Sequence, residues 1–195
     1  MYIKNFCDMK EDLKNALDVM KKGGVILYPT DTIWGIGCDA INTKAVERIY
    51  QIKKREDSKS MLMLVDESWR VSDYINEVPE IAMQLIEVAD SPLTIIYSGA
   101  KGISPKLISE DGSIGIRVSS DEFCRKLVGG LNRPIVSTSA NISGSPSPKN
   151  FSEISEEILK SVDYVVKWRQ EEKGNSKPSS IIKIGSRGEI VIIRK

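Results

Sequence analysis

Three groups of polar residues have side chains that could bind an anion. Two are the runs Thr30-Asp31-Thr32 and Ser137-Thr138-Ser139-Ala140-Asn141, and the third is the basic run Lys53-Lys54-Arg55, with Lys59 close behind it. The two hydroxyl runs follow predicted strands. Ligand crevices in open α/β sheets form beyond the carboxyl ends of the strands. The three groups therefore predict a cleft that accepts an anion.

The basic run has two interpretations. A charged run at the end of a helix is usually a solvated face that suits the helix dipole. Alternatively, the run is a phosphate clamp, in which Arg55 is a bidentate donor and Lys53 is a point charge. Spacing alone leaves both interpretations open.

The hydroxyl runs also have two interpretations. A Ser/Thr/Asn run after a strand is most often a turn or a helix cap. The same short neutral groups can also approach a phosphate, an adenine edge or an amino acid closely. Asp31 can either bind a substrate ammonium group or close an Asx-turn.

The sequence contains no histidine, which narrows the possible chemistry. Ser-His-Asp and Cys-His catalysis, an imidazole general base and histidine metal ligands are all excluded. There is no P-loop and no Gly-x-Gly-x-x-Gly motif, and Gly35-Ile36-Gly37 is only a weak fragment of one. The cysteines Cys7, Cys38 and Cys124 are too scattered for a zinc site and are expected to be small buried residues.

Composition predicts an ordinary globular protein. The chain has 195 residues, of which 41% are hydrophobic and 28% charged, so we expect a single domain spanning 1–195. Lys and Arg number 28 against 27 Asp and Glu, so net charge does not argue for a polyanionic partner. Early charges exclude a signal-peptide core, and no apolar run approaches the ~20 residues that cross a bilayer. We therefore expect a cytoplasmic protein with no membrane partner.

Apolar spacing predicts the elements that must position the polar groups. Helices are expected over 8–22, from Thr43 into the basic run, and over 79–88, 121–127 and 152–162. Gly129-Gly130 should end the fourth helix, and a capping box at Ser152 should begin the fifth. Strands are expected over 25–28, 61–65, 93–97, 113–118, 134–137, 164–168, 180–184 and 189–193. The last two strands read as an antiparallel hairpin, so we expect an α/β fold with a mixed sheet.

Six segments, in order along nearly the whole chain, match the motifs of one family. They are 28–40 (YPTDTIWGIGCDA), Lys53-Lys54-Arg55, 91–94 (SPLT), 115–118 (GIRV), 137–144 (STSANISG), and 178–182 (PSSII) with 192–194 (IIR). Together they resemble the motifs of the YrdC-like family of L-threonylcarbamoyladenylate synthases. Each match is modest by itself, but six matches in the same order along the chain are not expected by chance.

The resemblance implies a fold and a reaction. The fold is a twisted mixed sheet with flanking helices and a concave, basic groove. In the reaction, threonine and bicarbonate give N-carboxythreonine, whose carboxylate attacks the α-phosphorus of ATP. Pyrophosphate leaves, and threonylcarbamoyl-AMP remains for N6-threonylcarbamoylation of adenosine 37 in tRNA. The implied cofactor is Mg²⁺ carried with ATP, and tRNA or tRNA-modification proteins are possible downstream partners.

The resemblance also implies site residues, position by position. Contacts to threonine and bicarbonate fall on Thr32, Arg117, Ser137 and Ser179. Contacts to ATP fall on Lys53, Arg55, Lys59, Ser113, Ser139, Asn141, Ser147 and Arg194. Lys53 and Arg55 are the implied catalytic residues, and neutralising charge on a phosphoryl group suits a site without histidine.

The chain departs from the family's pattern at several positions. Leu64 stands where a histidine that touches threonine is common, and Ala89-Asp90-Ser91 replaces Trp-Pro-Gly. The Lys-x-Arg and Ser-x-Asn pairs are kept, which favours the nucleotide site over the amino-acid pocket. The alternative function is a paralogue that binds RNA or nucleotide through the same basic residues without this synthesis.

Overall fold

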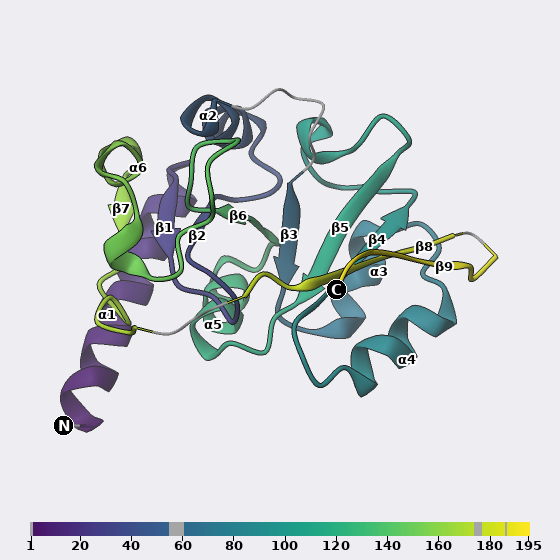
Figure 1. The fold of residues 1–195 in the computed structure, drawn as a ribbon, viewed down its shortest axis with the longest axis horizontal. Helices are drawn as coiled ribbons and strands as arrows, with labels where there is room; N and C mark the ends of the chain where they lie inside the picture. The colour runs from purple at the N-terminus through teal and green to yellow at the C-terminus, as the bar shows by residue number, and fades with distance from the viewer. Residues whose placement is uncertain (1, 55–60, 174–176, 186) are drawn as a thin grey trace.

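The computed structural model describes residues 2–54, 61–173, 177–185 and 187–195, and only the backbone of 2–8. Its helices are α1 (Tyr2–Lys21), α2 (Thr43–Lys53), α3 (Val71–Tyr74), α4 (Glu80–Val88), α5 (Glu122–Leu131) and α6 (Glu156–Ser161). Its strands are β1 (Ile26–Tyr28), β2 (Gly35–Gly37), β3 (Leu62–Val65), β4 (Leu93–Ser98), β5 (Ser113–Val118), β6 (Ile135–Ser139), β7 (Tyr164–Val165), β8 (Ser180–Ile184) and β9 (Ile190–Arg194). The predicted α/β class is confirmed (Figure 1).

The strands form one twisted mixed sheet in the order β7-β1-β2-β6-β3-β5-β4-β8-β9. The neighbours β1 and β7, β3 and β5, and β4 and β8 run parallel, and the other neighbours run antiparallel. The predicted β8–β9 hairpin is confirmed and reaches the far right of the molecule in Figure 1. In β3, Leu62 aligns with Ser137 of β6, and Leu64 aligns with Arg117 of β5. This register places Ser137 and Arg117, which are distant in the sequence, on the two strands that flank β3.

The run Gly35-Ile36-Gly37 is a buried strand and not part of a nucleotide-binding loop. It forms β2, which pairs with β1 on one side and β6 on the other. A Cβ on Gly37 would lie 2.5 Å from the carbonyl oxygen of Val136 and 2.7 Å from Tyr28 Cε1. The hydroxyl of Tyr28 donates to that same carbonyl at 3.2 Å. Glycine is required here because the Tyr28 ring crosses the strand.

The prediction that Gly129-Gly130 ends a helix is wrong. Helix α5 runs through both glycines to Leu131, and Asn132 caps it with a φ of 55°. A Cβ on Gly130 would lie 2.6 Å from Leu17 Cδ1 in α1. The glycine therefore serves the close packing of α5 against α1, which the local sequence cannot reveal.

Other boundaries also differ from the prediction. Ser155, not Ser152, is the N-cap of α6, because its hydroxyl accepts from the amide of Ile158 at 3.4 Å. β7 is limited to Tyr164–Val165, and Pro79 precedes α4 as its N-cap. The short helical stretch 68–74 was not predicted.

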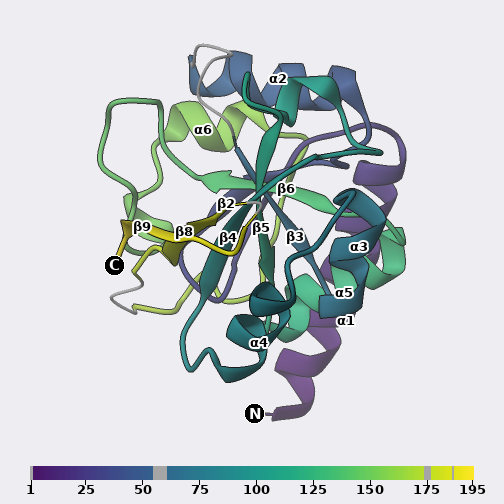
Figure 2. The same ribbon diagram turned by 90° about the vertical axis from the view of Figure 1, so that its right-hand side faces the viewer.

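Helices α1, α3 and α5 lie together on one side of the sheet in Figure 2. The strands of the centre are buried, whereas the edge strand β9 leaves Ile190, Val191, Ile192 and Ile193 between 46% and 59% exposed. Over the described part of the chain, no helix combines the length and apolar character needed to cross a membrane.

Candidate functional site

A cavity of about 210 Å³ is lined by residues from β2, β3, β5, β6, β8 and β9 and from the segments next to them. Its volume is below the ~300–1,000 Å³ of drug-sized ligand sites, so it suits a ligand the size of an amino acid. Part of its wall is formed by Ile33, Gly35, Met61, Leu62, Thr138, Pro178 and Ile181. The rest consists of residues expected from the sequence, namely Thr32, Arg117, Ser137, Ser139, Ser147, Ser179 and Arg194.

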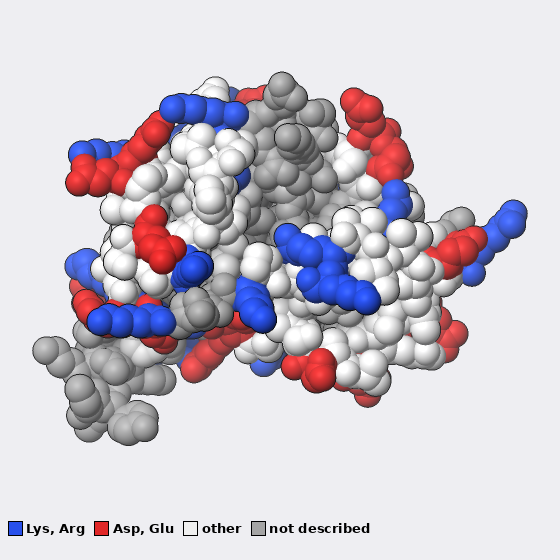
Figure 3. All heavy atoms as spheres, in the orientation of Figure 1, with Lys and Arg blue, Asp and Glu red and all other residues white. Residues whose placement is uncertain are grey.

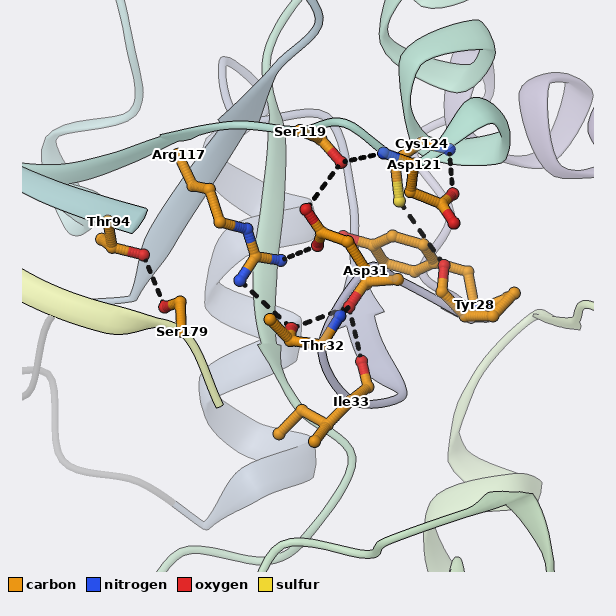
Figure 4. A network of polar contacts seen from close by, with 12 residues as sticks. Tyr28, Asp31, Thr32, Ile33, Thr94, Arg117, Ser119, Asp121, Cys124 and Ser179 are labelled. Carbon is orange, nitrogen blue, oxygen red and sulfur yellow. Dashed lines mark hydrogen bonds and ion pairs between the residues drawn. The ribbon is translucent and has the colours of Figure 1, made fainter. Parts of the chain in front are cut away.

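Arg117 is held at the cavity wall from two directions (Figure 4). Its Nη2 lies 2.9 Å from Asp31 Oδ1 in an ion pair, and its Nη1 donates to Thr32 Oγ1 at 3.1 Å. The side chain of Arg117 is only 3% exposed. Because two contacts fix the guanidinium group, its remaining N–H donors have defined positions.

Thr30 shapes the turn that carries Asp31 and Thr32. Its hydroxyl accepts from the amide of Thr32 at 3.0 Å and donates to the carbonyl of Ile33 at 2.8 Å. An Asx-turn at Asp31 would require its carboxylate to accept from the amide of Ile33, whereas among the described residues its two oxygens contact Arg117 and Ser119. The carboxylate of Asp31 is directed to Arg117 instead.

Two features make the cavity receptive to an anion. The Nε of Arg117 is buried and has no hydrogen-bond partner among the described residues, and a buried donor left unpaired costs about 1–3 kcal/mol. Arg194 donates from Nε to the carbonyl of Ser179 at 2.9 Å. Burial and the positive charge of Arg117 lower the pKa of Arg194, so each guanidinium lies in the field of the other. A carboxylate or phosphate bound near both arginines would accept hydrogen bonds from them and would offset the repulsion between their positive charges.

Thr94 supports Ser179 from behind, and sequence reasoning assigned it no role. The hydroxyl oxygens of the two residues lie 2.8 Å apart (Figure 4). Thr94 is 1% exposed and Ser179 is 3% exposed. The available signal was the segment 91–94, which matched a family motif and ends on this threonine.

Lys53 does not line the cavity. Its side chain is buried, and its Nζ donates to the carbonyls of Ser139 and Asn141 at 2.5 and 2.7 Å. The solvated-face interpretation is therefore wrong for Lys53, although the neighbouring Lys54 is exposed and pairs with Glu157. Lys53 instead holds the loop that follows β6.

Asn141 also contributes to that loop. Its Nδ2 donates to the carbonyls of Ile142 and Ser145 at 3.0 and 2.6 Å. Its Oδ1 is buried and lacks a hydrogen-bond partner within the described ranges. Asn141 does not line the cavity, so any contact with a nucleotide stays a prediction.

The remaining expected residues lie elsewhere. Ser113 begins β5, at the opposite end of the strand from Arg117, and its hydroxyl donates to Asp111 Oδ1 at 2.6 Å. Arg55 and Lys59 lie outside the described residues. Leu64 is fully buried in the core, whereas Leu62, two positions earlier on β3, lines the cavity.

The face in Figure 3 shows how charge is arranged around this region. Lys and Arg side chains gather near the end of β9, where Figure 1 marks the C-terminus, and Asp and Glu lie mostly toward the rim. The molecule is hollowed beside this basic group. The concave basic groove as a whole stays a prediction.

Comparison with known proteins gives matches over nearly the full chain. Residues 18–195 match the Sua5_yciO_yrdC family, which is described as telomere recombination. A Methanocaldococcus jannaschii protein, provisionally named threonylcarbamoyl-AMP synthase, is 38% identical over 191 residues, covering 95% of this chain and 88% of that protein. The threonylcarbamoyl-AMP synthase of Vibrio cholerae is 32% identical over 175 residues, covering 88% of this chain and 92% of that protein.

Solved structures share the fold. The E. coli YciO crystal structure superimposes with a TM-score of 0.81 at 27% identity, covering 94% of this chain and 88% of that one. P. abyssi Sua5, crystallised with L-threonine, superimposes with a TM-score of 0.81 at 24% identity. The present chain is matched over 93% of its length but spans only 53% of the Sua5 chain.

Proposed function

This chain belongs to the Sua5/YciO/YrdC family, and we propose that it is a threonylcarbamoyl-AMP synthase. Threonine and bicarbonate condense to N-carboxythreonine with loss of water. The new carboxylate attacks the α-phosphorus of ATP, the bond to the β-phosphate oxygen breaks, and pyrophosphate leaves. The product is threonylcarbamoyl-AMP, for transfer to adenosine 37 of tRNA.

One observation carries the proposal, namely the guanidinium of Arg117, buried and held by two residues at the wall of a cavity lined by hydroxyl groups. Arg117 is fixed by Asp31 and Thr32, so it offers a preorganised donor to a carboxylate. The hydroxyls of Thr32, Ser137 and Ser179 can bond the polar groups of an amino acid without adding charge. This set suits threonine and its N-carboxylated form.

The ATP contacts form the second half of the proposal. Arg194, Ser139 and Ser147 lie on the same cavity, so a phosphate that enters it meets one guanidinium and two hydroxyl groups. Lys53 orders the backbone of Ser139 and Asn141 next to them. Arg55, Lys59 and Ser113 complete the proposed set. Mg²⁺ enters as part of the substrate, carried by the phosphates of ATP.

Pyrophosphate release from ATP tests the proposal directly. We expect release only when threonine and bicarbonate are both present, and a product whose mass is that of threonylcarbamoyl-AMP. The variant Ser137→Ala should raise the KM for threonine, and Ser152→Ala, at a residue that does not line the cavity, should not. Equal pyrophosphate release after omission of threonine would contradict the synthase.

A binding paralogue without synthesis is the less favoured function. The synthase names of relatives at 38% and 32% identity support the enzyme instead. We further propose a cytoplasmic location, since the reaction consumes ATP and its product serves tRNA. Direct contact with tRNA or with tRNA-modification proteins belongs to the same proposal, and co-purification with them would test it.

A further inference from the structure

Arg169 has a backbone conformation that an arginine rarely adopts. Its φ is 67°, in the left-handed region that favours glycine. Lys54 and Asn132, the other non-glycine residues with positive φ within the described ranges, are the C-caps of α2 and α5. Arg169 caps neither of these helices, so its side chain must supply the compensating interactions.

The side chain of Arg169 connects three parts of the chain. Its Nη1 lies 2.7 Å from Asp121 Oδ2, and its Nε lies 2.7 Å from Glu172 Oε2. Nη1 also reaches the carbonyl of Thr30 at 3.5 Å, the limit of a hydrogen bond. The guanidinium group is 26% exposed and Asp121 is 12% exposed, so water screens this pair only in part.

Asp121 connects Arg169 to residues nearer the cavity. Asp121 caps α5 by accepting from the amide of Cys124 at 2.9 Å, and its own amide donates to Ser119 Oγ at 3.3 Å. Ser119 Oγ in turn donates to Asp31 Oδ2 at 3.4 Å, and Asp31 pairs with Arg117 (Figure 4). A continuous polar chain therefore runs from Arg169 to the guanidinium that lines the cavity.

We propose that Arg169 is a positioning residue that holds the Thr30–Thr32 turn, and with it the Asp31–Arg117 pair, in the geometry that receives an anionic substrate. It acts through two routes, the carbonyl of Thr30 and the chain through Asp121 and Ser119. Within the described residues, its hydrogen bonds go to Thr30, Asp121 and Glu172 and not to residues on the Arg194 side of the cavity. The identity of the anion, the carboxylate of threonine, rests on the proposed function.

The variant Arg169→Gly separates the role of the side chain from backbone strain, because glycine accepts this φ without cost. We expect the KM for threonine to rise about tenfold, the factor that corresponds to one hydrogen bond. The KM for ATP should stay within about twofold. Arg169→Lys should recover part of the threonine KM, since it keeps the charge opposite Asp121 but not the fork.

Arg48→Gln is the matched control. Like Arg169, Arg48 forms an ion pair with a carboxylate, that of Asp163, and a hydrogen bond to a backbone carbonyl, that of Ser161. Arg48, Asp163 and Ser161 do not line the cavity. Arg48→Gln should leave both KM values unchanged.

Hydrogen exchange provides a readout that does not depend on the proposed reaction. Amides of residues 30–34 should exchange faster in Arg169→Gly than in Arg48→Gln. Unchanged exchange there, or a lowered melting temperature with an unchanged threonine KM, would overturn the positioning role. If wild-type turnover proves independent of threonine, the proposed function fails, and faster exchange at 30–34 still supports the positioning of Arg117.

Discussion

Asp31 and Arg117 form an ion pair of 2.9 Å in which the side chains are only 8% and 3% exposed. Removal of one partner from a buried pair leaves an uncompensated charge, which costs about 3–5 kcal/mol. We therefore expect Asp31→Asn to lower the free energy of unfolding by an amount near 3 kcal/mol, the lower end of that range, and to weaken threonine binding. Urea unfolding and calorimetric titration measure the two effects.

The exposed pair of Glu156 and Lys160 is the control for this prediction. Glu156→Gln should cost no more than about 0.5 kcal/mol, as is usual for an exposed helical pair. Equal losses in the two variants would show that burial does not strengthen the Asp31–Arg117 pair.

Leu64→His introduces the histidine that the family resemblance implies at this position. Leu64 is fully buried and does not line the cavity, so the imidazole would enter the core without an evident partner. We expect a loss of about 2–5 kcal/mol in stability and no gain in threonine affinity. Leu62→His, at a partly exposed position on the cavity wall, should cost less. Tighter threonine binding with little loss of stability in Leu64→His would place this side chain in the binding site.

Gly37→Ala tests the close approach between β2 and Tyr28. The new methyl group would lie 2.5 Å from a backbone oxygen, which cannot move without displacing β6. We expect a loss of about 3 kcal/mol, the upper end for overpacking. In Gly129→Ala the methyl group would meet only Asp66 Oδ2 at 3.3 Å. A helical alanine gains up to about 1 kcal/mol, so this control should be neutral or slightly stabilising. Similar melting temperatures for the two variants would contradict the steric argument.

The lowered pKa of Asp111 makes the free energy of unfolding depend slightly on pH in the acid range. Hydrogen bonds from Lys183 and Ser113 lower its pKa to about 2, whereas an unfolded aspartate titrates near ~3.9. Because the folded pKa is the lower one, the contribution is complete above pH ~4 and is lost as pH falls toward about 2. Asp111 and Lys183 are 51% and 37% exposed, so screening keeps the effect below about 1 kcal/mol. Asp111→Asn should be less stable than wild type at pH 6 and equal to it below pH ~2, as followed by urea unfolding at each pH.

Features that depend on neighbours in sequence could be predicted from the chain alone. Helix α2 begins after Asn42 because that side chain accepts from the amide of Ala45 at 3.2 Å, three residues away. The strand over 113–118 and the closing hairpin were predicted for the same reason, since apolar alternation and a glycine turn are local signals. Family motifs then supplied a set of site residues that included Thr32, Ser137 and Arg194.

Only the tertiary structure decided which of these residues meet and what each side chain does. Thr32 and Arg117 are 85 positions apart, and strand order, not spacing, brings them into contact. The same holds for Gly130, whose need for a bare backbone comes from Leu17 in another helix. Lys53 is charged like Lys54, yet burial turns its amine toward two carbonyls. The physical reason is common to all three: packing fixes the partner of a side chain, and packing depends on segments that the local sequence does not contain.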